Sequence, residues 1–217
     1  MAVKFDPALI PTSPNLSLER SLYISGVEYL AGLDEAGRGA WAGPVTAAAV
    51  ILNLKLAVDR LLEGVRDSKQ LSPAKRWQLE PIIKQTAVTW GIGFASNQEI
   101  DQVGILPATR LAMTRALQSL QPAPQHLLID ALLLPEIDIP QTALIKGDQR
   151  SLSIAAASIL AKTARDRFMQ ELALSENHFR FEHNKGYGTR AHQAALRSYG
   201  PCPMHRFSYA PVKASVK

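Results

Sequence analysis

Residues 29–52, YLAGLDEAGRGAWAGPVTAAAVIL, decide how this chain folds. A short apolar run over 29–34 ends at the acid pair Asp34 and Glu35, and a Val/Ile-rich run follows over 45–52. Apolar runs of this length, bounded by glycines, are typical of buried strands. The short connection between the two runs predicts an antiparallel hairpin, with the acids where its first strand ends.

Outward from this hairpin, the chain continues with short apolar runs and longer helical patterns. Further strands are predicted at 86–95, 126–130 and 142–146, and helices at 73–85, 97–120, 151–174 and 190–199. Three strands with short connections, followed by strands separated by helices, indicate an α/β fold. We expect a five-stranded mixed sheet flanked by helices, with a C-terminal helical extension.

The composition is that of a folded protein suited to polyanionic partners. Hydrophobic residues make up 47% of the 217, which excludes disorder on compositional grounds. The formal net charge of +5 favours partners rich in phosphate. The single cysteine, Cys202, excludes an internal disulfide. No signal-peptide pattern opens the chain, and Pro44, Asn53 and Lys55 interrupt the apolar stretch 41–58, so we expect a cytoplasmic protein without a membrane span.

Several predicted strands carry acids where they end. Asp34 and Glu35 follow the first strand, Asp130 closes the fourth, and Asp148 follows the fifth. Any one of these acids, taken alone, could equally be a turn former or a helix cap. Four carboxylates gathered at one edge of a sheet would repel one another unless hard divalent cations neutralised them. Two such ions, about 3.5–4 Å apart, can activate a water and stabilise the leaving oxygen of a phosphodiester.

Four segments resemble the ribonuclease HII family, the type 2 ribonucleases H. They are the hairpin segment, DSKQLSPAKR at 67–76, KGDQRSLSIAAASILAKTARDR at 146–167 and HNKGYGTRAHQAALRSYGPCPMHRFSYAPV at 183–212. The four segments occur in the same order as in the family, and chance does not account for a similarity of four ordered segments. The resemblance implies a ribonuclease H-like fold with a catalytic domain over 26–217, whose C-terminal helical segment begins at about residue 176. Residues 1–25, with three prolines and little periodicity, are expected to form a flexible N-terminal arm.

The resemblance also implies an activity. It is endonucleolytic hydrolysis of the RNA strand of RNA–DNA hybrids and cutting 5′ of ribonucleotides in duplex DNA, leaving 3′-hydroxyl and 5′-phosphate ends. It implies two divalent ions, Mg²⁺ or Mn²⁺, and we expect a monomer. The residues that match the family's catalytic metal ligands are Asp34, Glu35, Asp130 and Asp148. The residues that match its substrate-binding positions are Gly37, Arg38, Gly39, Lys69, Ser158, Lys162 and Tyr187.

Alternatives remain for three of the substrate-binding positions. Lys69 could be a solvated loop lysine. Ser158 and Lys162 lie one helical turn apart, so they could share a helix face toward the substrate. Alternatively, they could simply pack against the protein or face solvent.

The chain departs from the family pattern at two places. Ala40 and Trp41 stand where the family often has proline and a small aliphatic residue, and residues 131–133, Ala-Leu-Leu, replace a glycine and a polar pair after Asp130. Neither departure removes a proposed ligand. Three rival interpretations are a ribonuclease HIII, another nuclease or strand transferase of the same fold, and a catalytically silent hybrid-binding module. About 28 residues before the first strand are too few for the extra N-terminal domain of ribonuclease HIII, and the four acids argue against a silent module.

Overall fold

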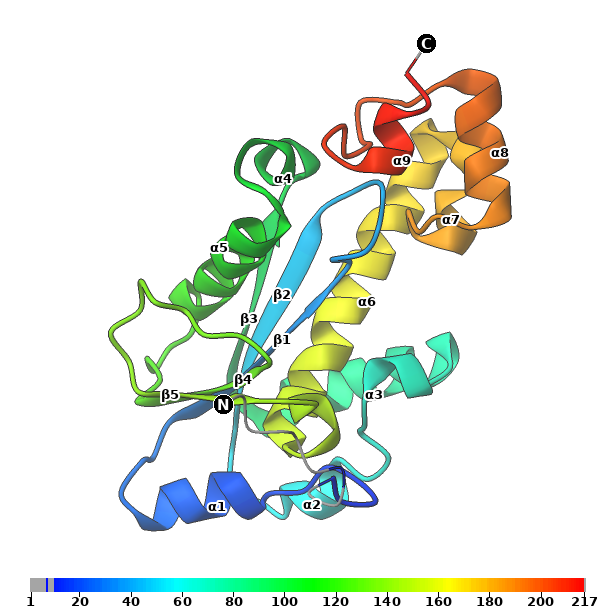
Figure 1. Cartoon of the computed structure of the whole chain (residues 1–217). Coiled ribbons are helices and arrows are strands. Elements are labelled where there is room, and N and C mark those ends of the chain that lie inside the picture. The colour runs from blue at the N-terminus through cyan, green and yellow to red at the C-terminus, as the bar shows by residue number, and fades with distance from the viewer. Residues whose placement is uncertain (1–6, 8–9, 217) are drawn as a thin grey trace.

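The computed structural model describes residue 7 and residues 10–216, and in this part a five-stranded mixed sheet forms the centre of the fold (Figure 1). The strands are β1 (Leu30–Ala36), β2 (Val45–Leu52), β3 (Ala87–Ala95), β4 (His126–Asp130) and β5 (Gln141–Leu144). Their order across the sheet is β3-β2-β1-β4-β5. β2 pairs antiparallel with both β1 and β3, whereas β4 pairs parallel with both β1 and β5. The predicted hairpin and mixed sheet are confirmed.

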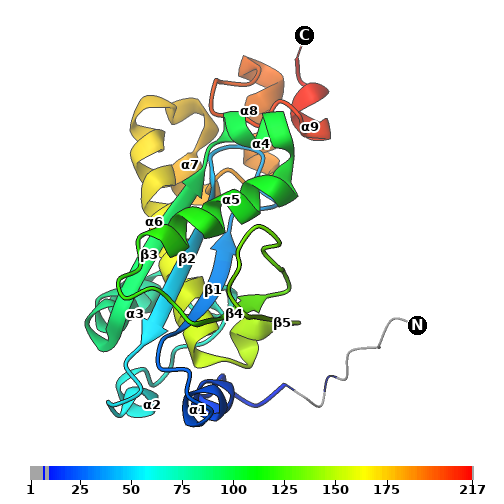
Figure 2. The same cartoon turned by 90° about the vertical axis from the view of Figure 1, so that its left-hand side faces the viewer.

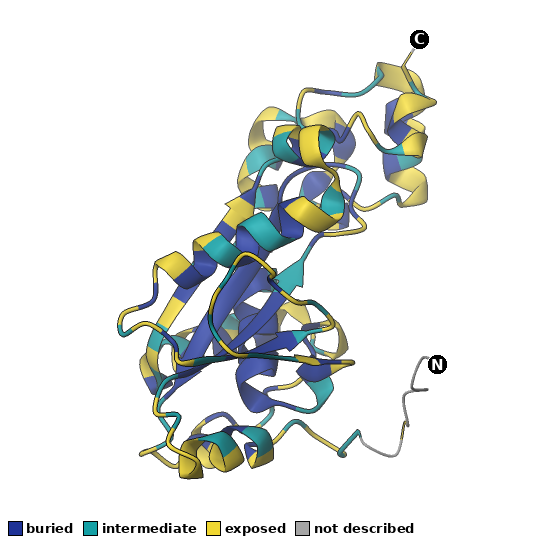
Figure 3. Cartoon of the chain, turned by 60° about the vertical axis from the view of Figure 1, so that its left-hand side comes forward, coloured by how far each residue is buried: buried dark blue, intermediate teal, exposed yellow. Residues whose placement is uncertain are grey.

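Helices cover both faces of the sheet (Figures 1 and 2). α5 (Ile105–Gln118) packs on one face, and α3 (Pro73–Thr86) and α6 (Leu152–Ser175) pack on the other. β2 is buried along its whole length, with Ala47 facing α5 and Ala48 facing α6, because successive side chains of a strand point to opposite faces. Figure 3 shows the resulting buried centre with exposed outer helix surfaces.

The alanine-rich first half of α6 lies unusually close to the sheet. At Gly32 of β1, an added Cβ would lie 2.3 Å from the backbone carbon of Ser153 and 2.5 Å from the backbone nitrogen of Ile154. Only glycine permits that approach, so Gly32 sets the distance between α6 and the strand that carries the first acids.

The remaining helices are short and lie at the two ends of the sheet. α7 (Phe181–Asn184), α8 (Arg190–Tyr199) and α9 (Ala210–Lys213) gather at the far end of α6 and form the C-terminal extension (Figure 1). The others are α1 (Ser17–Ile24), α2 (Val58–Leu61) and α4 (Asn97–Val103), with 3₁₀ turns η2 (Ser68–Gln70), η3 (Gly147–Gln149) and η4 (Asn177–Phe179). The helix expected over 97–120 is divided at Gly104, whose φ of 84° ends α4. No helix in the described part of the chain is both long and apolar enough to cross a bilayer.

The N-terminal region differs from the expectation of a flexible arm. Residues 17–24 form α1, whose Glu19 is 1% exposed. One oxygen of its carboxylate accepts hydrogen bonds from the Ser151 hydroxyl (2.6 Å) and from the backbone N–H (3.0 Å) and hydroxyl (2.8 Å) of Ser153, at the start of α6. The arm prediction is therefore wrong for this helix, because buried hydrogen bonds hold it to the domain. The positions 1–6 and 8–9 of that arm lie outside the described residues.

Candidate active site

The fold brings the four predicted acids to one edge of the sheet. Asp34 and Glu35 lie among the last three residues of β1, which runs on to Ala36 rather than ending at the first acid as predicted. Because β1 and β4 are parallel neighbours with Leu33 opposite Ile129, Asp130 lies level with Asp34. Asp148 lies in η3, directly after β5, and is 4% exposed. The sequence therefore placed these acids on the correct strand ends.

The acids lie close enough to perturb one another. Burial raises the pKa of Asp34 well above its ordinary value, and the negative charges of Glu35, Asp130 and Asp148 raise it further. Burial, followed by the charges of Asp67 and Asp130, raises the pKa of Asp148 to about 7. Such mutual repulsion marks a cluster suited to a compensating positive charge.

The other two acids have partners of their own. Burial raises the pKa of Glu35, and the Arg38 guanidinium, 3.3 Å from its Oε1, opposes that rise. The second oxygen of Glu35, Oε2, is buried and accepts no hydrogen bond. Burial also raises the pKa of Asp130, while the Gly147 N–H, which donates to its Oδ1 at 2.7 Å, lowers it.

These observations fit a hard divalent cation. The donor set consists of oxygens alone, the carboxyls raise one another's pKa, and Glu35 has a buried oxygen without a hydrogen-bond donor. Among the described residues no three His, Cys, Asp or Glu side chains lie close enough together to enclose an ion. Mg²⁺ binds through one or two carboxylates and retains several waters, so it does not require such an enclosure.

A fifth acid, Asp67, joins the cluster and was missed as a site residue. It is 6% exposed, and its charge is the largest electrostatic contribution to the raised pKa of Asp148. Its own oxygens accept the Lys69 backbone N–H at 2.9 Å and the Gln70 side-chain amide at 3.4 Å. The motif Asp-Ser-Lys was visible in the sequence, but nothing in it showed that Asp67 would face Asp148.

Lys69 places a positive charge beside these acids. Burial lowers the pKa of its ammonium, but the charges of Asp34, Asp67 and Asp148 outweigh burial, so its pKa is raised. Lys69 is therefore not a freely solvated loop lysine, because its ammonium is half-buried beside the acid cluster.

The Gly37–Gly39 loop is held by buried arginines from elsewhere in the chain. Gly37 has a φ of 94°, and an added Cβ would lie 2.0 Å from Nε of Arg165. Arg165 is fully buried and donates to the carbonyls of Pro44 (2.9 Å), Ala42 (3.1 Å) and Lys185 (2.8 Å). Around Gly39, by contrast, no atom lies within 4 Å of an added Cβ, so the loop is open there to a ligand.

Two further hydrogen bonds fix the backbone of Arg38, the middle residue of this loop. The carbonyl of Arg38 accepts hydrogen bonds from Arg206 Nη1 (2.9 Å) and from the Tyr209 hydroxyl (2.8 Å). Arg206 is fully buried, and its Nε donates to the Gly43 carbonyl at 3.0 Å. The C-terminal extension therefore sets the backbone of the Gly-Arg-Gly loop.

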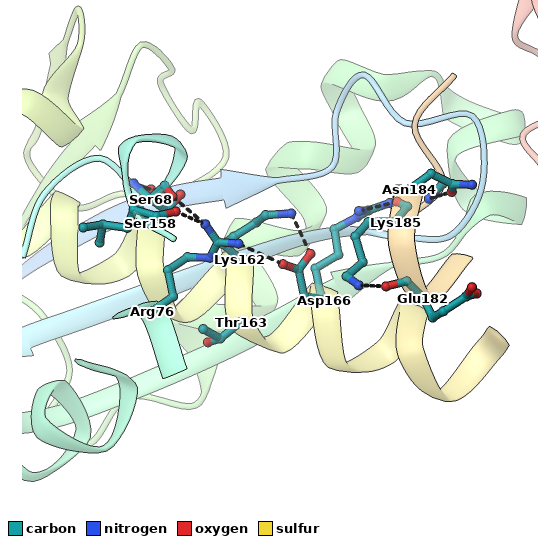
Figure 4. A network of polar contacts seen from close by, with 12 residues as sticks. Ser68, Arg76, Ser158, Lys162, Thr163, Asp166, Glu182, Asn184 and Lys185 are labelled. Atoms are coloured by element: carbon teal, nitrogen blue, oxygen red, sulfur yellow. Dashed lines mark hydrogen bonds and ion pairs between the residues drawn. The ribbon is translucent and has the colours of Figure 1, made fainter. Parts of the chain in front are cut away.

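Figure 4 shows a polar network along α6 that includes two of the predicted substrate residues. Ser158 is 2% exposed and donates to the Ser68 hydroxyl at 2.8 Å, so it supports the Asp-Ser-Lys loop. Lys162 Nζ lies 2.6 Å from Asp166, which also pairs with Arg76 at 3.4 Å. Lys162 remains partly exposed, with 18% of its side chain accessible.

Tyr187 lies at the end of this network. Its side chain is 37% exposed. Lys162 Nζ lies 5.8 Å from the centre of its ring, and the Arg165 guanidinium lies 5.4 Å from it. Both cations lie within cation–π range of the ring, which remains partly exposed to solvent.

Comparison with known proteins supports one family throughout. A family model of ribonuclease HII matches residues 31–212. The ribonuclease HII of Chloroflexus aurantiacus is 52% identical over 202 residues, which cover 92% of this chain and 94% of the relative. This chain belongs to the ribonuclease HII family. It is an endoribonuclease of the ribonuclease H type.

Solved structures confirm the fold of this ribonuclease HII. The ribonuclease H2 of Pyrococcus horikoshii OT3 has a TM-score of 0.71 and 27% identity over 86% of this chain and 96% of its own. A ribonuclease HIII, Bst-RNase HIII in complex with Mn²⁺, has a TM-score of 0.64 and 22% identity over 88% of this chain and 70% of its own, which shows the shared fold alone.

The two departures from the family pattern are accommodated by backbone hydrogen bonds. Trp41 donates its backbone N–H to Gly186 at 2.7 Å and accepts from Arg206 at 2.8 Å, so it ties the Gly-Arg-Gly loop to the Tyr187 segment. Ala131 has a φ of 54° but donates to Leu144 at 3.0 Å, which keeps Asp130 at the end of β4.

Proposed function

We propose that this ribonuclease HII hydrolyses the RNA strand of RNA–DNA hybrids and cuts on the 5′ side of a ribonucleotide embedded in duplex DNA. The products would carry 3′-hydroxyl and 5′-phosphate ends. The observation that carries the proposal is the position of four mutually repelling carboxyls beside an open Gly-Arg-Gly loop whose backbone is fixed by buried arginines.

The acids Asp34, Glu35, Asp130 and Asp148 are the proposed ligands for two divalent ions, Mg²⁺ or Mn²⁺. When bound, such ions supply a nucleophilic water and stabilise charge on the leaving oxygen. The protein's own part is to hold these carboxylates in place: the Gly147 N–H orients Asp130, and the Glu35 backbone N–H donates to Asp34 Oδ1 at 2.7 Å. Lys69 would bind a substrate phosphate next to the cluster.

Recognition of the ribonucleotide would lie with the Gly37–Gly39 loop and Tyr187. Only the 2′-hydroxyl distinguishes RNA from DNA at one position, and backbone N–H and C=O groups of an open glycine loop can hydrogen-bond to it. Tyr187 offers a partly exposed ring for stacking and a hydroxyl donor. Lys162, paired with Asp166, would contact the sugar–phosphate backbone of the substrate near the Tyr187 ring. We further propose a cytoplasmic monomer whose partners are hybrid and ribonucleotide-containing duplexes.

The test is cleavage of matched duplexes that carry one ribonucleotide, a run of RNA, or DNA alone. We expect cleavage of the first two in Mg²⁺ or Mn²⁺, with the cut mapped to the 5′ side of the ribonucleotide, and none of the third. Asp34→Asn should abolish cleavage but retain duplex binding, whereas Asp138→Asn, at an exposed loop position, should cleave as the parent does. Normal turnover by Asp34→Asn, or cutting 3′ of the ribonucleotide, would refute the proposal.

A further inference from the structure

Two buried histidines of the C-terminal extension form a hydrogen-bonded chain that ends on the backbone of Tyr187. His192, on α8, and His205 are both fully buried, and their Nε2 atoms lie 2.9 Å apart. His192 Nδ1 lies 3.0 Å from the Tyr187 carbonyl oxygen. Neither histidine has a part in the acid cluster or in the proposed substrate contacts.

The partners of each ring determine which nitrogen carries the proton. A carbonyl oxygen only accepts, so His192 carries its proton on Nδ1 and leaves Nε2 as an acceptor. The Cys202 backbone N–H donates to His205 Nδ1 at 3.0 Å, so His205 carries its proton on Nε2 and donates it to His192. With both rings neutral, each of the four ring nitrogens then has a hydrogen-bond partner. Burial lowers the pKa of both imidazoles, that of His205 to about 4 with a contribution from His192, which agrees with neutral rings.

Aromatic rings and a buried amide surround the two imidazoles. Phe179 meets His205 edge to face with centroids 4.7 Å apart, and Phe181 meets His192 edge to face at 5.5 Å. The Asn97 side-chain amide, at the start of α4, donates to the carbonyl of His205 at 3.1 Å. The histidine pair is therefore anchored to α4 through His205 and to Tyr187 through His192.

We propose that His192 and His205 are positioning residues that fix the Tyr187 ring for recognition of the ribonucleotide. The Tyr187 carbonyl accepts from the Thr189 N–H at 2.8 Å and from His192, so both of its lone pairs are directed. On its N-terminal side the segment is already fixed, because the Tyr187 N–H donates to the Asn184 carbonyl at 2.9 Å and the Gly186 carbonyl accepts from the Trp41 N–H at 2.7 Å. The histidine hydrogen bond adds a restraint on the C-terminal side, at the carbonyl of Tyr187 itself. This inference rests on the proposed role of Tyr187 and adds the residues that act through it.

The first test compares two substitutions at one position. His192→Asn keeps an amide donor where Nδ1 stands, and His192→Leu removes the donor but fills the volume. On a duplex with one ribonucleotide, we expect His192→Leu to lower the single-turnover rate by about tenfold or more with little change in binding, since misplacement by about 1 Å can cost about 100-fold. His192→Asn should stay within about threefold of the parent. His178→Leu, at an exposed histidine, is the matched control and should cleave normally.

Further readouts separate positioning from a merely structural role. If His192 acts through Tyr187, the double variant His192→Leu/Tyr187→Ala should be no slower than Tyr187→Ala alone. Equal defects in the Asn and Leu variants, additive losses in the double variant, or a defect in binding alone would overturn the proposal.

Nitrogen NMR of the parent protein tests the arrangement even where a variant fails to fold. We expect the rare Nδ1–H tautomer at His192 and the Nε2–H tautomer at His205. A proton on Nε2 of His192 would overturn the inference. A parent protein that leaves ribonucleotide-containing duplexes uncut would instead refute the proposed function, and the tautomers would still be measured.

Discussion

Replacing Asp148 by asparagine should stabilise the ion-free protein at pH 8. The carboxyl is 4% exposed, and burial together with Asp67 and Asp130 raises its pKa from 3.8 to about 7. The folded state then binds the proton more tightly than the unfolded state, so ionisation of Asp148 opposes folding. The contribution of Asp148 to the stability of the ion-free protein should be most favourable below about pH 4 and should be lost as the pH rises toward 7.

The magnitude follows from the same pKa. A rise of about three pKa units corresponds to about 4 kcal/mol, and because the neighbouring acids of the cluster share the repulsion and titrate together with Asp148, we expect about 2 kcal/mol from Asp148 alone. For a chain of this size, that is a gain of about 4–8 °C in Tm for Asp148→Asn at pH 8. At pH 4 the parent and Asp148→Asn should have the same Tm.

Thermal melts in a chelator, across pH 4 to 8, provide the measurement. Asp138→Asn, at an exposed loop position, controls for the general loss of one negative charge and should not shift Tm at any pH. Adding Mg²⁺ or Mn²⁺ should stabilise the parent more than Asp148→Asn, because the ions compensate the repulsion that the substitution has removed. Equal Tm values for the parent and Asp148→Asn in chelator at pH 8, or a less stable variant, would refute the reasoning.

Three further predictions follow from the geometry. Tyr187→Ala should lower the single-turnover rate on a one-ribonucleotide duplex far more than the affinity, and Tyr187→Phe should lose only the contribution of the hydroxyl; a defect confined to binding would contradict this. Lys69→Ala should weaken binding to all duplexes alike and reduce the slope of log affinity against log salt by about one, measured by salt titration; a loss limited to ribonucleotide-containing duplexes would show another role. Glu19→Ala should cost about 2 kcal/mol of unfolding free energy in denaturant titrations, because it leaves Ser151 and Ser153 without their acceptor; an unchanged midpoint would mean that the hydrogen bonds of Glu19 contribute nothing to stability.

The acids were predictable because strand ends are a local property. The apolar run over 29–34 and the strand 126–130 could be identified from short windows of sequence, and the parallel pairing of β1 with β4 then brings Asp34 level with Asp130. The loop glycines could be identified for the same reason, since Gly37 needs its positive φ whatever packs against it.

The support for the site could not be predicted in this way. Ser158 had the spacing of a substrate contact, yet the structure buries it against Ser68, 90 positions away in the sequence. Asp67 faces Asp148, and Arg206 reaches the carbonyl of Arg38 across 168 positions. Helical periodicity gives the face of a helix but not which distant loop covers that face.

The sequence by itself determined the order of strands and helices, the strand ends that carry the acids, and the motifs that resemble ribonuclease HII. Only the tertiary structure decided that α1 is docked through Glu19 and that His192 and His205 form a chain to Tyr187. The physical reason is that strand and helix patterns follow from neighbours a few residues apart, whereas hydrogen bonds and pKa values depend on burial among groups that packing alone brings together.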